Sequence, residues 1–166
     1  MSLRILGIDP GSRTTGFGVI EISAGQARYV TSGCLRVADK GDLPQRLKAI
    51  FEGVGEIVSE FAPQEMAIEQ VFVQRNVDSA LKLGQARGAA ICAATAQGLE
   101  VFEYTPTRIK QAVVGRGHAT KDQVQFMMKR LLQLSAEPQQ DAADALACAL
   151  CHFNSRDLLK LKEAHS

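Results

Sequence analysis

Two aspartates three residues apart, Asp141 and Asp144, are the clearest sign of chemistry in the sequence, and they lie in the stretch DAADALACALCHF. Residues i and i+3 share one face of a helix, so both carboxylates would point in the same direction. The dipole at a helix start could explain Asp141. It does not explain Asp144, which lies one turn further on among apolar residues, where a charge is rarely buried without a partner.

The second half of the same stretch, Cys148-Ala-Leu-Cys151-His152, matches the pattern for covalent attachment of a c-type haem. Such attachment requires export to an oxidising compartment, and the first residues, MSLRILGIDPGS, lack the features of a secretion signal. We therefore expect no haem. Instead, we expect Cys148 and His152 to continue the aspartate face of the helix along a sheet, with the thiols acting as small core residues.

Two further carboxylates stand where short apolar runs end. Asp9 ends LRILGID before the turn-prone PGS, and Glu69 ends the apolar part of MAIEQVF. Each has a simpler explanation, because Asp9 could cap the turn and Glu69 could reach solvent from a strand end. If the two runs are neighbouring parallel strands, however, their C-terminal ends lie about 4.8 Å apart. Open α/β sheets place their sites at that edge, so the two carboxylates would face each other there.

Bringing four carboxylates together is unfavourable, because like charges about 4 Å apart repel by roughly 4 kcal/mol even at an effective dielectric of about 20. Divalent metal ions would reverse the sign of this interaction, and oxygen ligands favour Mg²⁺ or Mn²⁺ over zinc. Two such ions about 3.5–4 Å apart can activate water and stabilise the leaving oxygen in phosphodiester cleavage. The sequence therefore predicts a metal-dependent nuclease.

The elements that would position these carboxylates follow from hydrophobic periodicity and turn signals. We predict strands over residues 3–9, 16–23, 27–37, 65–73 and 100–105, and helices over 43–62, 77–98, 106–113, from Thr120 onward, and 139–154. The first three strands should form an antiparallel meander. The whole is an α/β fold with one mixed five-stranded sheet and helices on its faces. Residues 1–154 would form a single domain and residues 155–166 a flexible tail.

Composition supports a globular chain. It has 166 residues, of which 46% are hydrophobic, and no run of about 18 apolar residues that would predict a membrane span. Without a targeting signal, the expected location is the cytoplasm. The formal net charge is only +1, but residues 105–130 hold six basic side chains and a single acidic one. Such a concentration beside an acidic site is typical of a protein that binds a phosphate backbone.

Individual residues near the predicted site could contact DNA. Lys121 falls in the first turn of a predicted helix, where free N–H groups favour phosphate, and Arg116 lies in VGRGHA, whose glycines would allow close approach to DNA. Phe72 follows Glu69 by three residues. Core burial is the usual place of phenylalanine, but here it could stack on an unpaired base, a contact worth about 1–3 kcal/mol. Arg75 beside it could pair with phosphate.

Seven segments together resemble the RuvC family of bacterial Holliday-junction resolvases. In chain order they are ILGIDPGSRTTGFGVIE, AIEQVF, DSALKLGQARG, VFEYTP, KQAVVGRG, TKDQVQ and DAADALA. The resemblance implies a ribonuclease H-like fold and a homodimer that binds four-way DNA junctions. It also implies paired symmetric nicks by Mg²⁺-dependent hydrolysis during homologous recombination and DNA repair, and an association with the RuvA–RuvB branch-migration machinery.

The resemblance also assigns roles to residues. The catalytic carboxylates of the family fall on Asp9, Glu69, Asp141 and Asp144, the same four reached above. Its DNA-contacting lysines match Lys110 and Lys121, and its aromatic residue near the junction centre matches Phe72.

Three alternatives remain open at this point. GIDPGS resembles the phosphate loop of ATP-binding proteins of the actin and sugar-kinase type, although these need a second lobe with another such loop. A junction-binding module without catalysis is a second alternative, against which four intact carboxylates argue. A ribonuclease H-like enzyme acting on RNA hybrids is the third, and it differs only in its substrate.

Overall fold

One mixed sheet forms the centre of the computed structural model, which describes residues 1–72, 76–115 and 117–163. Among these residues there are five strands, β1 (Leu3–Asp9), β2 (Thr14–Ser23), β3 (Gln26–Arg36), β4 (Glu65–Glu69) and β5 (Glu100–Tyr104). They are ordered β3-β2-β1-β4-β5, with β1, β2 and β3 antiparallel and with β4 and β5 running parallel to β1. The predicted meander and the mixed five-stranded sheet are confirmed.

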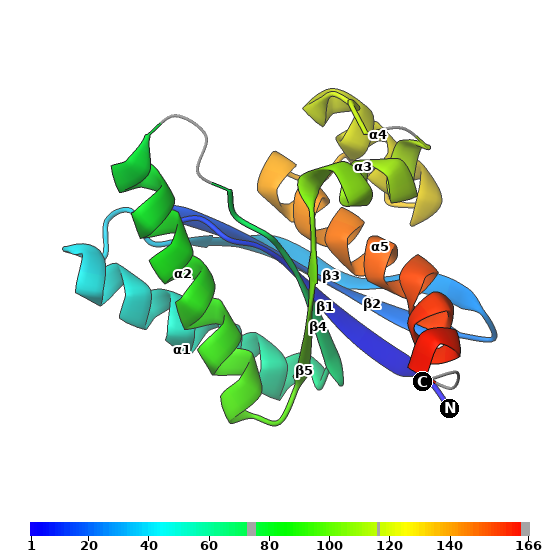
Figure 1. The fold of residues 1–166 in the computed structure, drawn as a ribbon, viewed down its shortest axis with the longest axis horizontal. Coiled ribbons are helices and arrows are strands. Elements are labelled where there is room, and N and C mark those ends of the chain that lie inside the picture. The colour runs from blue at the N-terminus through cyan, green and yellow to red at the C-terminus, as the bar shows by residue number, and fades with distance from the viewer. Residues whose placement is uncertain (73–75, 116, 164–166) are drawn as a thin grey trace.

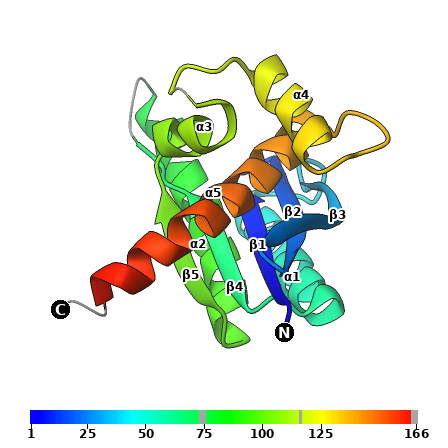
Figure 2. The ribbon, with the colours of Figure 1, turned by 90° about the vertical axis from the view of Figure 1, so that its right-hand side faces the viewer.

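Helices cover both faces of this sheet (Figure 1). In the same part of the chain they are α1 (Leu43–Phe61), α2 (Val77–Ala96), α3 (Pro106–Val114), α4 (Lys121–Leu131) and α5 (Gln140–Glu163). The first two pack together on one face, whereas α5 lies on the other and carries α3 and α4 on its outer side. Figure 2 shows α5 crossing the strands obliquely. No helix of the described residues has the length and apolar character that crossing a membrane requires.

Capping boxes set the starts of two helices. The Asp42 carboxylate accepts the N–H of Gln45, whose side chain accepts the N–H of Asp42 in return. Thr120 and Gln123 make the same reciprocal pair before α4. The predicted starts of the two helices, at residue 43 and at Thr120, agree with these caps, and the second cap fixes Lys121 as the first residue of α4.

Side-chain alternation decides which face of the sheet each residue serves. Ile5 of β1 and Ala67 of β4 belong to the core beneath α5, whereas Ile8 belongs to the core beneath α1 and α2. Asp9 and Glu69 keep the odd-numbered phase of Ile5 and Ala67. Both carboxylates are therefore directed to the side of the sheet on which α5 lies.

Glycines let the backbone of α5 approach the strands very closely. A Cβ atom at Gly7 of β1 would lie 1.9 Å from the carbonyl oxygen of Ala145, and one at Gly16 of β2 would lie 2.0 Å from that of Asp141. Real Cβ atoms do not come so near a backbone oxygen. The missing side chains thus set the depth at which the first turns of α5 lie on the sheet.

A buried polar network anchors α5 near the start of β4. His152 is fully buried, and burial lowers the pKa of its imidazole. In the neutral ring, Nδ1 accepts a 2.6 Å hydrogen bond from the Tyr104 hydroxyl, and Nε2–H donates at 2.7 Å to Glu65. Arg156 donates to both oxygens of Glu65, at 2.8 and 2.7 Å. The ring of Phe102 stacks on the imidazole at 4.3 Å.

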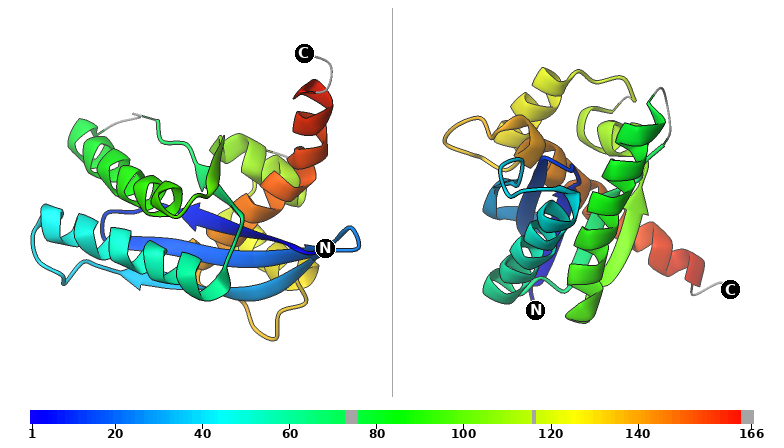
Figure 3. Two further views of the ribbon diagram at one scale, coloured as in Figure 1. Left: turned by 90° about the horizontal axis from the view of Figure 1, so that it is seen from below. Right: turned by 90° about the vertical axis from the view of Figure 1, so that its left-hand side faces the viewer.

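The structure corrects two predicted boundaries. The strand predicted over 65–73 ends at Glu69, because β5 beside it ends at Tyr104, and Thr105 and Pro106 begin α3 there. The final helix does not end at Asn154 but continues to Glu163, so at least the first part of the predicted tail is helical. Its contact with Glu65 through Arg156 stabilises this extension, whose last turns project beyond the sheet (Figure 3).

Replacing Gly7 by alanine should destabilise the protein, because the new methyl group would collide with the Ala145 carbonyl. We expect a loss of about 3 kcal/mol in the free energy of unfolding, at the upper end for overpacked cores. Gly55→Ala in α1 is the matched control, because the nearest atom to its new Cβ is Gln97 Nε2 at 3.4 Å. It should raise stability by about 0.5–1 kcal/mol, the usual gain at a helical glycine. Equal stabilities of the two variants in urea unfolding would contradict the close contact.

Candidate active site

Four carboxylates meet where the strands end and α5 begins. Asp9 is the last residue of β1 and Glu69 the last of β4, while Asp141 and Asp144 lie in the first turns of α5. Oxygen atoms of Asp9, Asp141 and Asp144 all lie within 4.8 Å of one another. Glu69 is not part of this group of three, but its side chain is hydrogen-bonded to that of Asp9.

A cavity of about 390 Å³ opens at this point. Its polar wall consists of the four carboxylates, Thr14, and the two lysines Lys110 of α3 and Lys121 of α4. Pro10 and Gly11 contribute the turn after β1, and Pro106, Ile109 and Val124 form an apolar side. The site is therefore acidic at its floor and basic at its rim, and the structure brings the two predicted lysines to the same cavity as the acids.

Electrostatics in the cavity disfavour ionised carboxylates. Burial is the main cause that raises the pKa of Asp9 to about 9, followed by repulsion from Asp144, Glu69 and Asp141. Burial also raises the pKa of Asp144 to about 6, although Lys121 and Lys110 oppose that rise.

The pKa of Glu69 shifts in the same direction. Burial is the main cause, followed by repulsion from Asp144, while the hydrogen bond with Asp9 and the two lysines pull the value down. Without a cation, Asp9 therefore holds a proton that it shares with Glu69 through their hydrogen bond.

This arrangement fits a bound metal ion. Carboxylate oxygens of three aspartates from two elements lie close enough together to bind one ion. Repulsion between the carboxylates helps to keep Asp9 protonated, and a divalent cation would take the place of that proton. All the metal-binding atoms that these acidic side chains offer are oxygen atoms, which hard cations prefer as ligands. The cluster could thus hold a metal ion, with Asp9, Asp141 and Asp144 as the nearest set.

Phe72 lies beside the acidic cluster and not in the core. Its side chain is 57% exposed, so core burial, the usual outcome for phenylalanine, is not observed. Together with Leu83 it lines a smaller cavity of about 210 Å³ that also includes Asp9 and Glu69. The two other predicted DNA contacts, Arg75 and Arg116, lie outside the described residues.

Sequence reasoning missed Thr15, which supports the turn behind Asp9. Its side chain is fully buried, and its hydroxyl donates to the Gly11 carbonyl at 2.9 Å and accepts the Gly11 N–H at 3.3 Å. A polar residue at an otherwise apolar strand position, four residues after a glycine turn, was the available signal. Thr15 holds the Pro10–Gly11 turn closed at the edge of the cavity.

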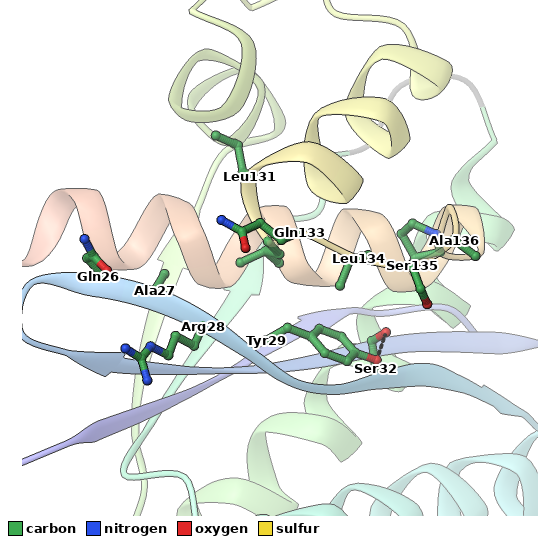
Figure 4. Close-up of a pocket in the computed structure, with 12 residues that line it drawn as sticks. Gln26, Ala27, Arg28, Tyr29, Ser32, Leu131, Gln133, Leu134, Ser135 and Ala136 are labelled. Carbon is green, nitrogen blue, oxygen red and sulfur yellow. Dashed lines mark hydrogen bonds between the residues drawn. The ribbon is translucent and has the colours of Figure 1, made fainter.

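A larger cavity lies elsewhere in the described structure. It has a volume of about 890 Å³ and separates β3 from the chain between α4 and α5 (Figure 4). Tyr29 and Ser32, which share a 3.0 Å hydrogen bond, border it on one side, and Gln133 and Ser135 border it on the other. None of its described lining residues is acidic, so size alone does not indicate where the chemistry lies.

The metal-free protein should lose stability as pH rises from about 4 to about 9. Over this range folded Asp9 keeps a proton that the unfolded chain releases, so each pH unit disfavours folding by up to about 1.4 kcal/mol. Urea unfolding in chelator should show this slope, and Asp9→Asn should flatten it. Asp39→Asn, at an exposed aspartate, is the control and should keep the slope of the unmodified protein. An undiminished slope in Asp9→Asn would contradict the assignment.

Comparison with known proteins places this chain in a family. The family model described as crossover junction endodeoxyribonuclease RuvC matches residues 5–152. A RuvC from Aeromonas hydrophila is 63% identical over 155 residues, which are 93% of this chain and 89% of that protein. A RuvC from Hahella chejuensis is 58% identical over 157 residues, or 95% of this chain and 91% of that one.

Solved structures agree with the sequence comparison. Thermus thermophilus RuvC is 35% identical, with a TM-score of 0.81 over 93% of this chain and 96% of that chain. The same protein in complex with a Holliday junction substrate gives a TM-score of 0.85 over the same shares. The yeast mitochondrial Holliday junction resolvase Ydc2, at 13% identity and a TM-score of 0.67 over 95% of this chain and 82% of that one, shares the fold. The chain therefore belongs to the RuvC family of crossover junction endodeoxyribonucleases and has its ribonuclease H-like fold.

Proposed function

We propose that this protein cuts four-way (Holliday) DNA junctions by metal-dependent hydrolysis of phosphodiester bonds, through paired symmetric nicks in homologous recombination and DNA repair. The observation that carries the proposal is the convergence of four carboxylates in a cavity rimmed by Lys110 and Lys121. The relative from Thermus thermophilus, solved in complex with a Holliday junction substrate, supports the choice of DNA.

In this proposal Asp9, Glu69, Asp141 and Asp144 are the catalytic residues and the ligands of Mg²⁺, with Mn²⁺ as a substitute and with two ions per site. Such ions supply an activated water and stabilise the charge on the leaving oxygen. The chain itself holds the carboxylates at fixed positions on two strand ends and one helix. Because their ionised forms repel each other, the cluster is prepared for cations before DNA arrives.

The basic rim would hold the DNA backbone. Lys121 is the first residue of α4, so its ammonium group and the free N–H groups of the helix start both favour a phosphate there. Lys110 faces the same cavity from α3. Arg75 and Arg116 are further proposed phosphate contacts. Exposed Phe72, on the other side of the acidic cluster, is proposed to stack on a base that the junction leaves unpaired.

Paired nicks require two active sites, so we propose a homodimer. Helix α2 supports this proposal, because its apolar side chains Val77 and Leu81 are 61% and 63% exposed. The RuvA–RuvB complex is a proposed partner, and the cytoplasm, where junction DNA of a bacterial chromosome lies, is the proposed location.

The decisive experiment compares substrates and metal. A four-way junction with fixed arms, a linear duplex of the same sequence and an RNA–DNA hybrid are incubated with the protein in Mg²⁺ or in chelator. We expect the junction alone to be cut, and only with Mg²⁺. Asp9→Asn should abolish cutting and leave junction binding in a gel-shift assay largely intact, because the DNA-contacting side chains remain. Equal cutting of the duplex, preference for the hybrid, or cutting in chelator would overturn the proposal.

Lys121→Ala should slow junction cutting and weaken junction binding, since it removes one phosphate contact. The slope of log affinity against log salt concentration should fall by about 1. Lys48→Ala on α1 is the control, because Lys48 lies on the opposite face of the sheet in an exposed ion pair with Glu52. Filter binding at several salt concentrations measures both variants, and an unchanged slope in Lys121→Ala would remove it from the DNA site.

A further inference from the structure

Glu69 and Asp9 both lie just beyond the last pair of their shared ladder. Strands β1 and β4 pair only as far as Ile8 opposite Ile68, so the backbone of Glu69 is paired on one side alone, with Tyr104 of β5. Asp9 is likewise paired on one side, with Gly16 of β2. Glu69 must nevertheless remain beside Asp9 and Asp144, both of which repel it when ionised.

Arg87 of α2 supplies a contact on the peptide that follows Glu69. Its Nε–H donates a 3.1 Å hydrogen bond to the carbonyl oxygen of Glu69. The N–H of Gln70, in the same peptide unit, donates at 2.8 Å to the carbonyl oxygen of Tyr104. The last peptide of the strand is thus held at both of its polar groups, one by a side chain and the other by β5.

The guanidinium group of Arg87 is itself fixed in place. Nη2 lies 2.6 Å from a carboxylate oxygen of Glu103 on β5, an ion pair that makes no aligned hydrogen bond within the described residues. The Arg87 side chain is only 18% exposed, whereas that of Glu103 is 45% exposed, so the pair lies at the boundary between the protein and solvent. A planar guanidinium can hold a carbonyl and a carboxylate at once, which the single ammonium of lysine cannot do in the same geometry.

We propose that Arg87 is a positioning residue for the metal site, which holds the end of β4 so that the Glu69 carboxylate keeps its place beside Asp9. This inference rests on the proposed role of Glu69 as a metal ligand. Arg87 is not among the residues that line the cavity of the four carboxylates. It acts through the backbone of a ligand, and groups in that relation to a metal typically change affinity or activity by about 10–100-fold.

Mn²⁺ binding to the full-length protein without DNA, measured by titration calorimetry, tests this role. Arg87→Met should weaken Mn²⁺ binding at least about tenfold. Arg87→Lys keeps the positive charge and provides a second variant in case Arg87→Met misfolds. It should weaken Mn²⁺ binding as well, but less than Arg87→Met does. Binding to the junction in chelator should equal that of the unmodified protein for both variants, because no DNA contact is removed.

Arg4 provides a matched control. It also pairs with a glutamate, Glu21, at 3.1 Å, and also donates to a backbone carbonyl, that of Phe61, at 2.8 Å. It lies at the opposite end of β1, however, so Arg4→Met should cost stability without changing Mn²⁺ affinity. Thermal unfolding of both variants separates general destabilisation from an effect on the site. If Arg87→Met and Arg87→Lys bind Mn²⁺ as Arg4→Met does, the proposal is wrong.

Glu69→Gln distinguishes this inference from the proposed function. If it leaves Mn²⁺ affinity unchanged, Glu69 is no ligand, and the role of Arg87 is overturned with it. If Glu69→Gln and both Arg87 variants weaken Mn²⁺ binding while the unmodified protein cuts no junction, the substrate proposal fails and the role of Arg87 stands.

Discussion

The mutual repulsion of four carboxylates is the constraint on which the rest of this structure depends. Two of them end parallel neighbouring strands, and two lie on a helix that crosses those strands. Burial and repulsion together drive the pKa of Asp9 to about 9, which shows how strongly the bare cluster resists ionisation. Nothing in the local sequence would keep such groups together, so the whole α/β framework has to do so.

The fold supports the four carboxylates through different contacts. Asp9 is paired with Gly16 of β2, and Asp141 and Asp144 are carried by a helix that the absence of side chains at Gly7 and Gly16 lets approach the sheet closely. Glu69 has a neighbouring strand on one side only at its position, and a side chain from α2 completes its support. Val77 and Leu81 are exposed on the same helix, α2. A partner that covers them would therefore contact the helix that carries Arg87.

Local patterns predicted most of what lies close in sequence. Apolar runs ending in Asp9 and Glu69, and the i, i+3 spacing of the aspartates, were enough to bring the acids to one edge. The starts of α1 and α4 were equally local, because residues next to each start cap the helix. The end of β4 could not be predicted from local patterns, because the apolar residues after Glu69 continue the strand pattern while the neighbouring strand β5 ends.

Contacts between distant segments could not be predicted either, because they too depend on residues of other elements. The extension of α5 depends on Arg156 meeting Glu65, 91 positions earlier, and the support of Glu69 depends on Arg87 on another element. Phe72 was predicted at the site, but only the structure shows that its ring is left uncovered beside the acids.

The anchor formed by Glu65, His152 and Arg156 is a second support of α5, in addition to its close contacts with Gly7 and Gly16 near the aspartates. Asp144 lies eight residues from His152, about 12 Å along the helix axis. A rotation of only one degree at the anchor would shift Asp144 by about 0.2 Å, a sizeable part of the roughly 0.5 Å within which catalytic groups must be held. The contacts of His152 and Arg156 with Glu65 therefore bear on the position of Asp144, although they lie outside the cavity.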